Sequence, residues 1–139
     1  MEHVVFCALL DEIEQLLSSL DSIAEVGLLS TVVERVLRQH AETETDLAYA
    51  ALDHILAEKG ELEHLYQDHR EIDHNFTQVH RASSLAEAKR LLKKALVATR
   101  EHFRHEEQVV FPLLERALPG ETLIYLGESW LLERSFVAP

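Results

Sequence analysis

The chain has 139 residues, of which 47% are hydrophobic, and its formal net charge is −12 with the histidines counted as neutral. This length predicts a single domain over residues 1–139 with a buried core. The acidic balance excludes nucleic acid as a partner, because that binding depends on lysine and arginine contacts to phosphates. It argues equally against anionic membrane surfaces.

Cysteine content and the N-terminal sequence bear on the cellular compartment. Cys7 is the only cysteine, which excludes an internal disulfide and fits a reducing compartment. The apolar run 4–10 is too short to span a membrane, and no basic segment of a signal peptide precedes it. We therefore expect a cytoplasmic protein without a membrane span, and the sequence identifies no protein partner.

The first half of the chain has the apolar periodicity of two helices. Apolar residues recur at helical intervals over residues 2–24, which predicts a first helix. The sequence Thr31-Val-Val-Glu34 has the form of a capping box and predicts the start of a second helix. That helix is expected to continue to Lys59, because Gly60 follows and glycine commonly ends helices.

The second half contains two further long helices. Helical periodicity over residues 61–81 predicts the third. The sequence Ser84-Leu-Ala-Glu87 is another capping box and predicts the start of the fourth. Pro112 is expected to kink this fourth helix, because proline lacks the backbone N–H that a helix interior requires.

The order of these elements predicts the fold class. Pro119-Gly120 ends the fourth helix, and a short extra helix is expected over residues 121–133. Four long helices with short connections predict an all-α, up-down-up-down four-helix bundle. Its core would comprise residues 1–118.

The motif His-x-x-x-Glu occurs twice, each time within a predicted long helix. The two copies are His40 with Glu44 and His102 with Glu106. Residues four apart share one face of a helix, so each pair could hold one ion. An isolated pair of this kind is commonly a solvated ion pair, but two pairs in similar positions of two halves favour a shared site.

A single histidine precedes each pair by about the length of one helix. These histidines are His3 and His69, and each follows an acidic residue and precedes an apolar one by three positions. Four imidazoles and two carboxylates suit iron, manganese or zinc, and this number of ligands suits two metals better than one. His54 falls about 21 Å further along the second helix than His40 and is not predicted to be a ligand.

Four short sequences occur in an order and spacing that together form a pattern: Glu2-His3-Val-Val-Phe6, His40-Ala-Glu-Thr-Glu44, Asp68-His69-Arg-Glu-Ile72 and His102-Phe-Arg-His-Glu106-Glu107. Val109-Val-Phe-Pro112 and Leu126-Gly-Glu-Ser-Trp130 extend the pattern toward the end of the chain. In these residues the chain resembles the hemerythrin-like, or HHE cation-binding, family over nearly its whole length.

The resemblance implies a hemerythrin-like bundle around a non-haem di-iron site with an oxo or hydroxo bridge. The implied ligands are Glu44 and Glu106 bridging the two iron ions, His3 and His40 on one iron, and His69 and His102 on the other. Members of the family bind dioxygen, react with peroxide or nitric oxide, or sense iron and oxygen. The expected partner is therefore a small diatomic molecule or a peroxide.

The third predicted helix departs from the family pattern. The family often carries a second histidine four residues before the one matched by His69, and that position here is Leu65. The seventh ligand is then Tyr66, Asp73 or His64, or it is absent, and a phenolate from Tyr66 would favour peroxide chemistry. Glu107 is an alternative to Glu106, because some relatives place the carboxylate one residue later.

Other functions compete with the di-iron interpretation. The same residues suit zinc or manganese in a regulatory module, and the histidines of a purely structural bundle would be incidental. Ferritin-like iron storage is disfavoured, because it uses Glu-x-x-His on two helices, whereas Glu61-x-x-His64 and Glu71-x-x-His74 share one predicted helix. The motifs leave open whether the chain is a carrier, a sensor or an enzyme, and they identify no catalytic residue.

Overall fold

The computed structural model describes residues 2–135; Met1 and residues 136–139 of the predicted domain lie outside this description. Nearly all described residues are helical, and none of them forms a strand. The helices are α1 (Glu2–Leu16), α2 (Ile23–Thr43), α3 (Ala50–Glu58), α4 (Glu61–His80), α5 (Leu85–His105), α6 (Phe111–Ala117) and α7 (Gly120–Ser135). A 3₁₀ turn, η1 (Leu17–Ser19), and two π-helical segments, η2 (Glu44–Tyr49) and η3 (Glu106–Val110), complete them.

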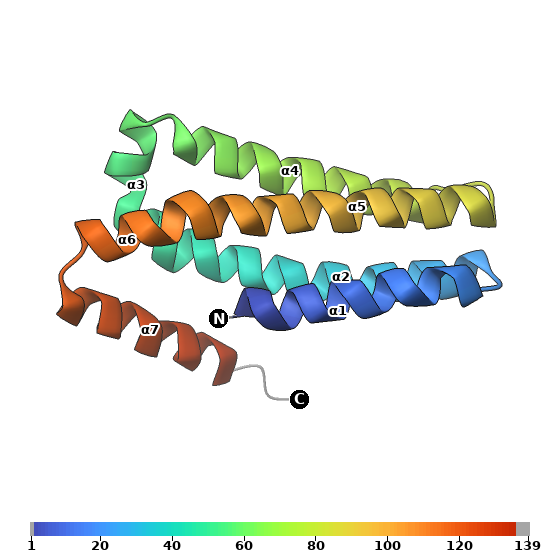
Figure 1. Cartoon of the computed structure of the whole chain (residues 1–139), viewed down its shortest axis with the longest axis horizontal. Coiled ribbons are helices and arrows are strands. Elements are labelled where there is room, and N and C mark those ends of the chain that lie inside the picture. The colour runs from blue at the N-terminus through green and yellow to red at the C-terminus, as the bar shows by residue number, and fades with distance from the viewer. Residues whose placement is uncertain (1, 136–139) are drawn as a thin grey trace.

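Helices α1, α2, α4 and α5 lie side by side along the long axis of the molecule (Figure 1). The segments α2, η2 and α3 follow one another without a break, and so do α5, η3 and α6. Helix α3 turns away from the direction of α2 at one end of the bundle, and α7 returns along the side where α1 begins (Figure 1). The prediction of an all-helical bundle is confirmed. Within the described residues the extra helix expected over 121–133 is found as α7, which has 16 residues and begins and ends slightly beyond the expected range.

The start of α2 corrects one prediction. Ser22 caps this helix, because its Oγ accepts a hydrogen bond from the backbone N–H of Glu25 at 3.2 Å. The Glu25 carboxylate in turn accepts from the N–H of Asp21 at 2.7 Å. Thr31 lies within α2, where its hydroxyl donates to the carbonyl of Gly27 at 3.0 Å. The prediction that α2 begins at Thr31 was wrong, because Ser22-x-x-Glu25 is a capping box of the same form and is the first one after α1.

Two other helix ends agree with the sequence. Gly60 adopts the left-handed conformation, with φ 72°, between α3 and α4. This backbone conformation favours glycine over residues with a side chain. Ser84 caps α5 by accepting from the N–H of Glu87 at 3.2 Å, and Glu87 accepts from the N–H of Ser83 at 2.9 Å. The capping box at Ser84 and the helix end at Gly60 could therefore be predicted from the neighbouring sequence alone.

The π-helical segments interrupt the α-helical repeat directly at the predicted carboxylate ligands. Segment η2 begins at Glu44, and η3 begins at Glu106. A π-helix bonds each carbonyl to the residue five positions on, so it shifts the face presented by the following residues. Pro112 lies in the first turn of α6, immediately after η3. The irregularity expected at this proline is thus found just before it.

The hydrophobic core consists of two clusters separated along the helices by polar residues. On α2 and its continuation, Leu37 belongs to one cluster and Ala48 to the other. On α4, Leu65 and Ile72 likewise belong to different clusters, with His69 between them. The core therefore positions a polar layer inside the bundle. Within residues 2–135 no helix is both long and apolar enough to cross a membrane.

Candidate metal centre

The six predicted ligands meet in this polar layer. His3 lies on α1, His69 on α4, and the two His-x-x-x-Glu pairs lie where α2 and α5 pass into π-helix. His3 is 4% exposed and the others are comparably buried, except for the half-buried His69. Ligand atoms of the six residues fall into two compact groups, in each of which they lie within 4.8 Å of one another. One group is Glu44, His69, His102 and Glu106, and the other is His3, His40 and Glu44.

The imidazoles converge through their Nε2 atoms. The Nε2 atoms of His3 and His40 are 3.0 Å apart, and those of His69 and His102 are 2.8 Å apart. Each motif also converges internally, because His40 Nε2 lies 2.9 Å from Glu44 and His102 Nε2 lies 2.7 Å from Glu106. Four ring nitrogens and two carboxylates thus point at a common interior volume.

These donor atoms fit metal ions better than they fit each other. Both carboxylate oxygens of Glu44 and Oε1 of Glu106 are buried and make no hydrogen bond of adequate geometry, although imidazole nitrogens approach them. A buried polar atom without a partner costs about 1–3 kcal/mol. Close approach without hydrogen-bond alignment is the arrangement expected of ligands that point at a shared ion. The residues present therefore pass the chemical test for a two-metal site.

Burial and mutual repulsion push the two carboxyl groups toward different protonation states. Burial raises the pKa of Glu44, and the adjacent Glu106 carboxylate raises it further. Burial also opposes ionisation of Glu106, but the adjacent Glu44 carboxyl group and His102 outweigh it and lower the pKa of Glu106. Of the two carboxyl groups, Glu44 is therefore the one that holds a proton more readily.

The imidazoles are mostly held neutral, which is the form that binds metal. Burial lowers the pKa of His40 to about 4 despite the hydrogen bond to Glu2. Burial likewise lowers the pKa of His69 to about 4, and the neighbouring His102 lowers it further. His102 differs: burial lowers its pKa, but the Glu106 and Asp68 carboxylates outweigh that effect and raise it.

Two carboxylates outside the ligand groups contact the Nδ1 atoms of His40 and His102, whose Nε2 atoms face the interior of the site. Glu2 contacts Nδ1 of His40 at 2.7 Å, and Asp68 contacts Nδ1 of His102 at 3.2 Å. Each of these acids immediately precedes the single histidine of its own half, yet orients the histidine of the following motif. A carboxylate on the outer nitrogen fixes the ring tautomer and strengthens the other nitrogen as a ligand. The repeated acid–histidine dipeptide seen in the sequence thus has a structural reason.

Helix α7 extends this outer layer on one side. Nη2 of Arg134 donates to Glu2 at 2.9 Å, and Nη1 of Arg134 donates to the hydroxyl of Thr43 at 2.8 Å. The Arg134 guanidinium also lies 5.4 Å from the ring centre of Trp130, whose ring meets that of His40 edge-on at 5.6 Å. Burial would raise the pKa of Glu2, but hydrogen bonds with Arg134, His40 and Trp130 lower it to about 2.

Tyr49 is a residue of the site that sequence reasoning missed. It is fully buried in η2, and its hydroxyl donates to Oε2 of Glu106 at 3.1 Å and lies 3.3 Å from Nε2 of His69. Five residues separate it from Glu44, a spacing that points away from the ligand face in an α-helix. The π-helical turn brings residues at this spacing onto one face, so only knowledge of η2 would have identified Tyr49.

The three candidates for a seventh ligand lie outside both ligand groups. Tyr66 packs edge-on against the ring of Tyr49 at 6.0 Å. His64 is 53% exposed and lies 3.7 Å from Asp68. Asp73 lines a cavity on the side of the site, and burial raises its pKa. The Tyr49 hydroxyl, which the sequence did not suggest, instead contacts the ligand candidate Glu106 at 3.1 Å.

Other sequence alternatives are also placed by the structure. Glu107 is 54% exposed and lies outside the two groups, where its Oε1 is 3.4 Å from Nδ1 of His3, whereas Glu106 is fully buried. His54 is 85% exposed and lies 3.3 Å from Glu58. Glu61 pairs with His105 at 2.8 Å rather than with a member of the cluster. The geometry thus favours Glu106 over Glu107 and separates His54 from the site.

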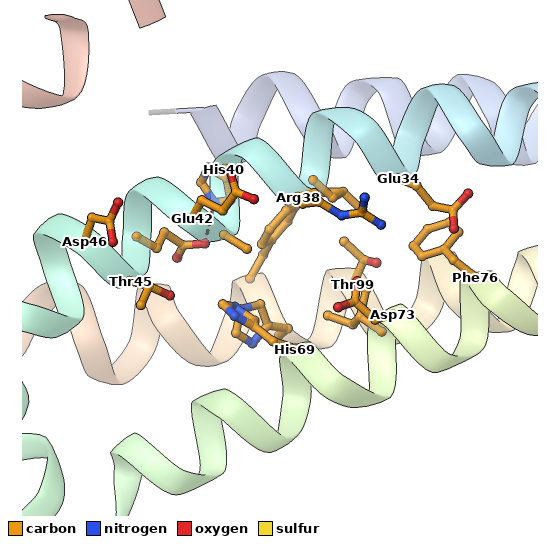
Figure 2. Close-up of a pocket in the computed structure, with 16 residues that line it drawn as sticks. Glu34, Arg38, His40, Glu42, Thr45, Asp46, His69, Asp73, Phe76 and Thr99 are labelled. Carbon is orange, nitrogen blue, oxygen red and sulfur yellow. Dashed lines mark hydrogen bonds and ion pairs between the residues drawn. The ribbon is translucent and has the colours of Figure 1, made fainter. Parts of the chain in front are cut away.

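Two cavities open beside the cluster. The first, of about 460 Å³, lies between α2 and α4 and is bordered by His40, Glu44, His69 and His102. Figure 2 shows Arg38 and His40 from α2 across this space from His69 and Asp73 of α4. Its lining also includes the charged side chains of Glu34, Arg38, Glu42, Asp46 and Asp73. The second, of about 560 Å³, lies against α7 and is bordered by His3 and His40.

One comparison with known proteins gives a match that covers the second half of the chain. Residues 60–125 match the family model described as the hemerythrin HHE cation binding domain. The match includes His69, His102 and Glu106, while His3, His40 and Glu44 lie before it. No curated protein and no solved structure matches the chain. Over residues 60–125 the chain is therefore similar to the hemerythrin HHE cation binding domain, the family that its sequence motifs resemble.

Proposed function

We propose that this chain is a non-haem di-iron protein that binds or reacts with a small oxidant: dioxygen, a peroxide or nitric oxide. The observation that carries the proposal is the sharing of Glu44 between the two ligand groups. A carboxylate that belongs to both groups can bridge two metals, and the accompanying mixture of imidazole and carboxylate is suited to iron. Sensing of oxygen or iron by the same site is part of this proposal.

In this proposal helices α1, α2, α4 and α5 act as the up-down-up-down four-helix bundle of the family, with α7 added on one side. The proposed ligands are His3 and His40 for one iron, His69 and His102 for the other, and Glu44 and Glu106 as bridges. When bound, such an iron pair would supply electrons and open coordination positions. Everything else in the site would be done by residues of the chain.

Three features of the chain would then control the chemistry. Phe103 stacks on the ring of His3 with centroids 4.1 Å apart, and Phe6 meets the ring of His40 edge-on at 4.9 Å. These aromatic rings would keep water away from one half of the site. The Tyr49 hydroxyl holds Glu106 at 3.1 Å and would fix the orientation of that carboxylate. The charged cavity between α2 and α4 would give ions and water access to the other half.

The runner-up is a zinc or manganese site with a regulatory or structural role, which uses the same nitrogen and oxygen ligands. Ferritin-like storage is less well supported, because His64 is 53% exposed and Glu61 pairs with His105 outside the cluster. The two metal classes differ in redox behaviour, so a spectroscopic experiment separates them.

The test is an optical titration of metal-free protein with ferrous iron under anaerobic conditions, followed by air, hydrogen peroxide or nitric oxide. The proposal predicts new near-ultraviolet bands that develop with one of these oxidants and reach full intensity at two irons per chain. A protein that stays colourless with every oxidant and prefers a single zinc ion would overturn it in favour of the runner-up. His54→Ala is the control variant, because His54 lies outside the ligand groups.

A further inference from the structure

The cavity between α7 and the bundle differs in character from the charged cavity between α2 and α4. It has a volume of about 560 Å³. Its walls are mainly apolar and include Leu47, Phe111, Leu114, Leu123, Leu126 and Trp130. Small-molecule sites in proteins are typically apolar hollows of roughly 300–1,000 Å³ with a few polar groups at one place. The cavity against α7 has this composition.

The size of this cavity exceeds what a diatomic ligand requires. A water molecule, comparable in size to dioxygen, occupies about 30 Å³ in the liquid. The roughly 560 Å³ available could therefore hold a molecule with many more atoms. If α7 served only to exclude water from a gas-binding site, its side chains could close this space, because Gly127 on the cavity wall leaves room for a larger side chain.

The inner end of the cavity presents a polar atom without a partner. His3 borders the cavity and is 4% exposed, and its Nδ1 makes no hydrogen bond of adequate geometry. The nearest carboxylate oxygen, Oε1 of Glu107, lies 3.4 Å away, and Glu107 also borders the cavity. Nδ1 is thus the ring nitrogen on the side of Glu107, a residue of the cavity wall, while Nε2 faces His40 in the ligand cluster. A ligand head group that reaches Nδ1 would lie one imidazole away from the proposed metals.

The charges around the cavity select against ionic ligands. Its charged lining residues are Glu107 and Glu115, and no lysine or arginine lines it within the described part of the chain. An anion would lack a cationic partner in these apolar walls, and its burial without one would be costly. A cation would have to approach two metal ions at the inner end once the site is loaded. An uncharged ligand avoids both penalties.

We propose that this cavity binds an uncharged, mainly apolar organic molecule whose single hydroxyl or hydroperoxyl head group hydrogen-bonds to Nδ1 of His3. Alkyl hydroperoxides and their alcohol products belong to this class. The inference rests on the proposed function in one respect, since it identifies the peroxide class that would reach the metal site. The binding step itself requires only residues of the chain, so it can be tested without iron.

The only tryptophan of the chain, Trp130, lines the cavity and makes a direct probe available. The experiment titrates metal-free protein with cumyl alcohol and follows the fluorescence of Trp130. We expect a saturable change, and we expect phenylacetate, of similar size but negatively charged, to bind at least about tenfold more weakly, a difference of about 1.4 kcal/mol. Equal or tighter binding of phenylacetate would overturn the proposed ligand class.

Two glycines of α7 provide a matched pair of variants. A Cβ atom at Gly127 or at Gly120 would meet no atom within 4 Å, so both sites accept a side chain without a clash. Gly127 lines the cavity and Gly120 does not. Gly127→Leu should weaken cumyl alcohol binding by about tenfold, whereas Gly120→Leu should leave it unchanged. Equal effects of the two substitutions would contradict binding in this cavity.

A second variant tests the polar end of the cavity. Glu107→Gln removes the negative charge nearest His3 Nδ1 and should bring phenylacetate binding closer to that of cumyl alcohol, by about threefold or more. No change in the ratio of the two affinities would contradict the assignment of the head group to this end. If cumyl alcohol binds as described but ferrous loading fails, the cavity stands and the di-iron proposal falls. If iron loads but cumyl alcohol does not bind, the di-iron proposal stands and the cavity proposal falls.

Discussion

Glu2 at the start of α1 and Arg134 near the end of α7 are joined through both carboxylate oxygens. Nε of Arg134 donates to Oε1 of Glu2 at 2.5 Å, and Nη2 donates to Oε2 at 2.9 Å. The same Oε2 contacts Nδ1 of His40 at 2.7 Å. A bidentate pair of this kind fixes geometry as well as charge. The position of α7 is therefore coupled to the orientation of a proposed metal ligand.

Replacement of Arg134 should weaken metal binding without unfolding the bundle. Arg134→Met removes the donors that hold Glu2, so His40 loses part of its orientation. Loss of such an outer partner typically lowers metal affinity by about tenfold or more. No residue of α7 is fully buried, so the rest of the core should persist. Competition with a metal chelator measures the affinity, and circular dichroism measures the helicity.

Arg116 supplies the matched control for this substitution. It lies exposed on α6, away from the cluster. Arg116→Met should leave metal affinity unchanged, and Arg134→Lys should fall between wild type and Arg134→Met, because lysine keeps the charge but not the two-point contact. Equal affinities of the two Met variants would show that the Arg134–Glu2 contact does not orient His40.

Substitution within the second motif should lower the number of bound metals. His102→Ala and Glu106→Ala each remove a buried ligand candidate, whereas His54→Ala removes an exposed side chain. We expect the first two variants to retain fewer metal ions per chain than wild type and the third to match wild type. Elemental analysis after loading and desalting provides the count. The same loss in all three variants would mean that the site lies elsewhere.

The hydroxyl of Tyr49 should contribute measurably to stability in the absence of metal. It donates to the buried carboxylate of Glu106, and a hydrogen bond to a charged group contributes about 1.5–3 kcal/mol. Tyr49→Phe should therefore lower the free energy of unfolding in urea by about 2 kcal/mol. Tyr66→Phe, a neighbouring tyrosine outside the ligand groups, should change it by less than about 0.5 kcal/mol. A larger loss for Tyr66→Phe than for Tyr49→Phe would contradict the assignment.

The metal-free protein should become less stable as the pH falls from about 6.5 to about 4. His40 and His69 have pKa values of about 4 in the folded chain, below the ordinary value of 6.5. Between these values the unfolded chain binds protons that the folded chain rejects, which costs about 1.4 kcal/mol per pH unit for each histidine. The pKa of His3 is lowered as well, whereas His102 and Glu44, with raised pKa values, act in the opposite direction.

Urea denaturation in the presence of a chelator checks this pH dependence. The expected curve falls as the pH is lowered below 6.5, and His69→Gln should flatten the fall by removing one of the titrating groups. Unchanged or rising stability between pH 6.5 and pH 4 would show that these imidazoles are not buried in the neutral form. Loaded protein should release metal over the same acidic range, because protons compete for the ligand nitrogens.

The sequence carried the information about the inner layer of the site but not about the groups that orient it. Motif spacing on a regular helix was sufficient to bring His40 and Glu44 together, because residues four apart share a face. It failed for Tyr49, whose approach depends on a π-helical turn that no residue pattern marks. It failed also for Arg134, because the packing of α7 against α1 is set by contacts between distant segments.

Helix boundaries show the same division between local and non-local information. The glycine stop at Gly60 and the cap at Ser84 were predicted from local chemistry and are found in the structure. The cap predicted at Thr31 failed because two serine or threonine motifs of the same form compete, and the end of α1 decides between them. Apolar spacing alone could not decide where that first helix ends.

The number of metal ions per chain tests the central claim most directly. Metal-free protein is loaded anaerobically with ferrous iron, freed of excess metal, and analysed for iron and protein together with its optical spectrum before and after oxidation. We expect about two irons per chain, since two ligand groups share Glu44. No retained iron, or a single ion that leaves the protein colourless after oxidation, would contradict a di-iron site.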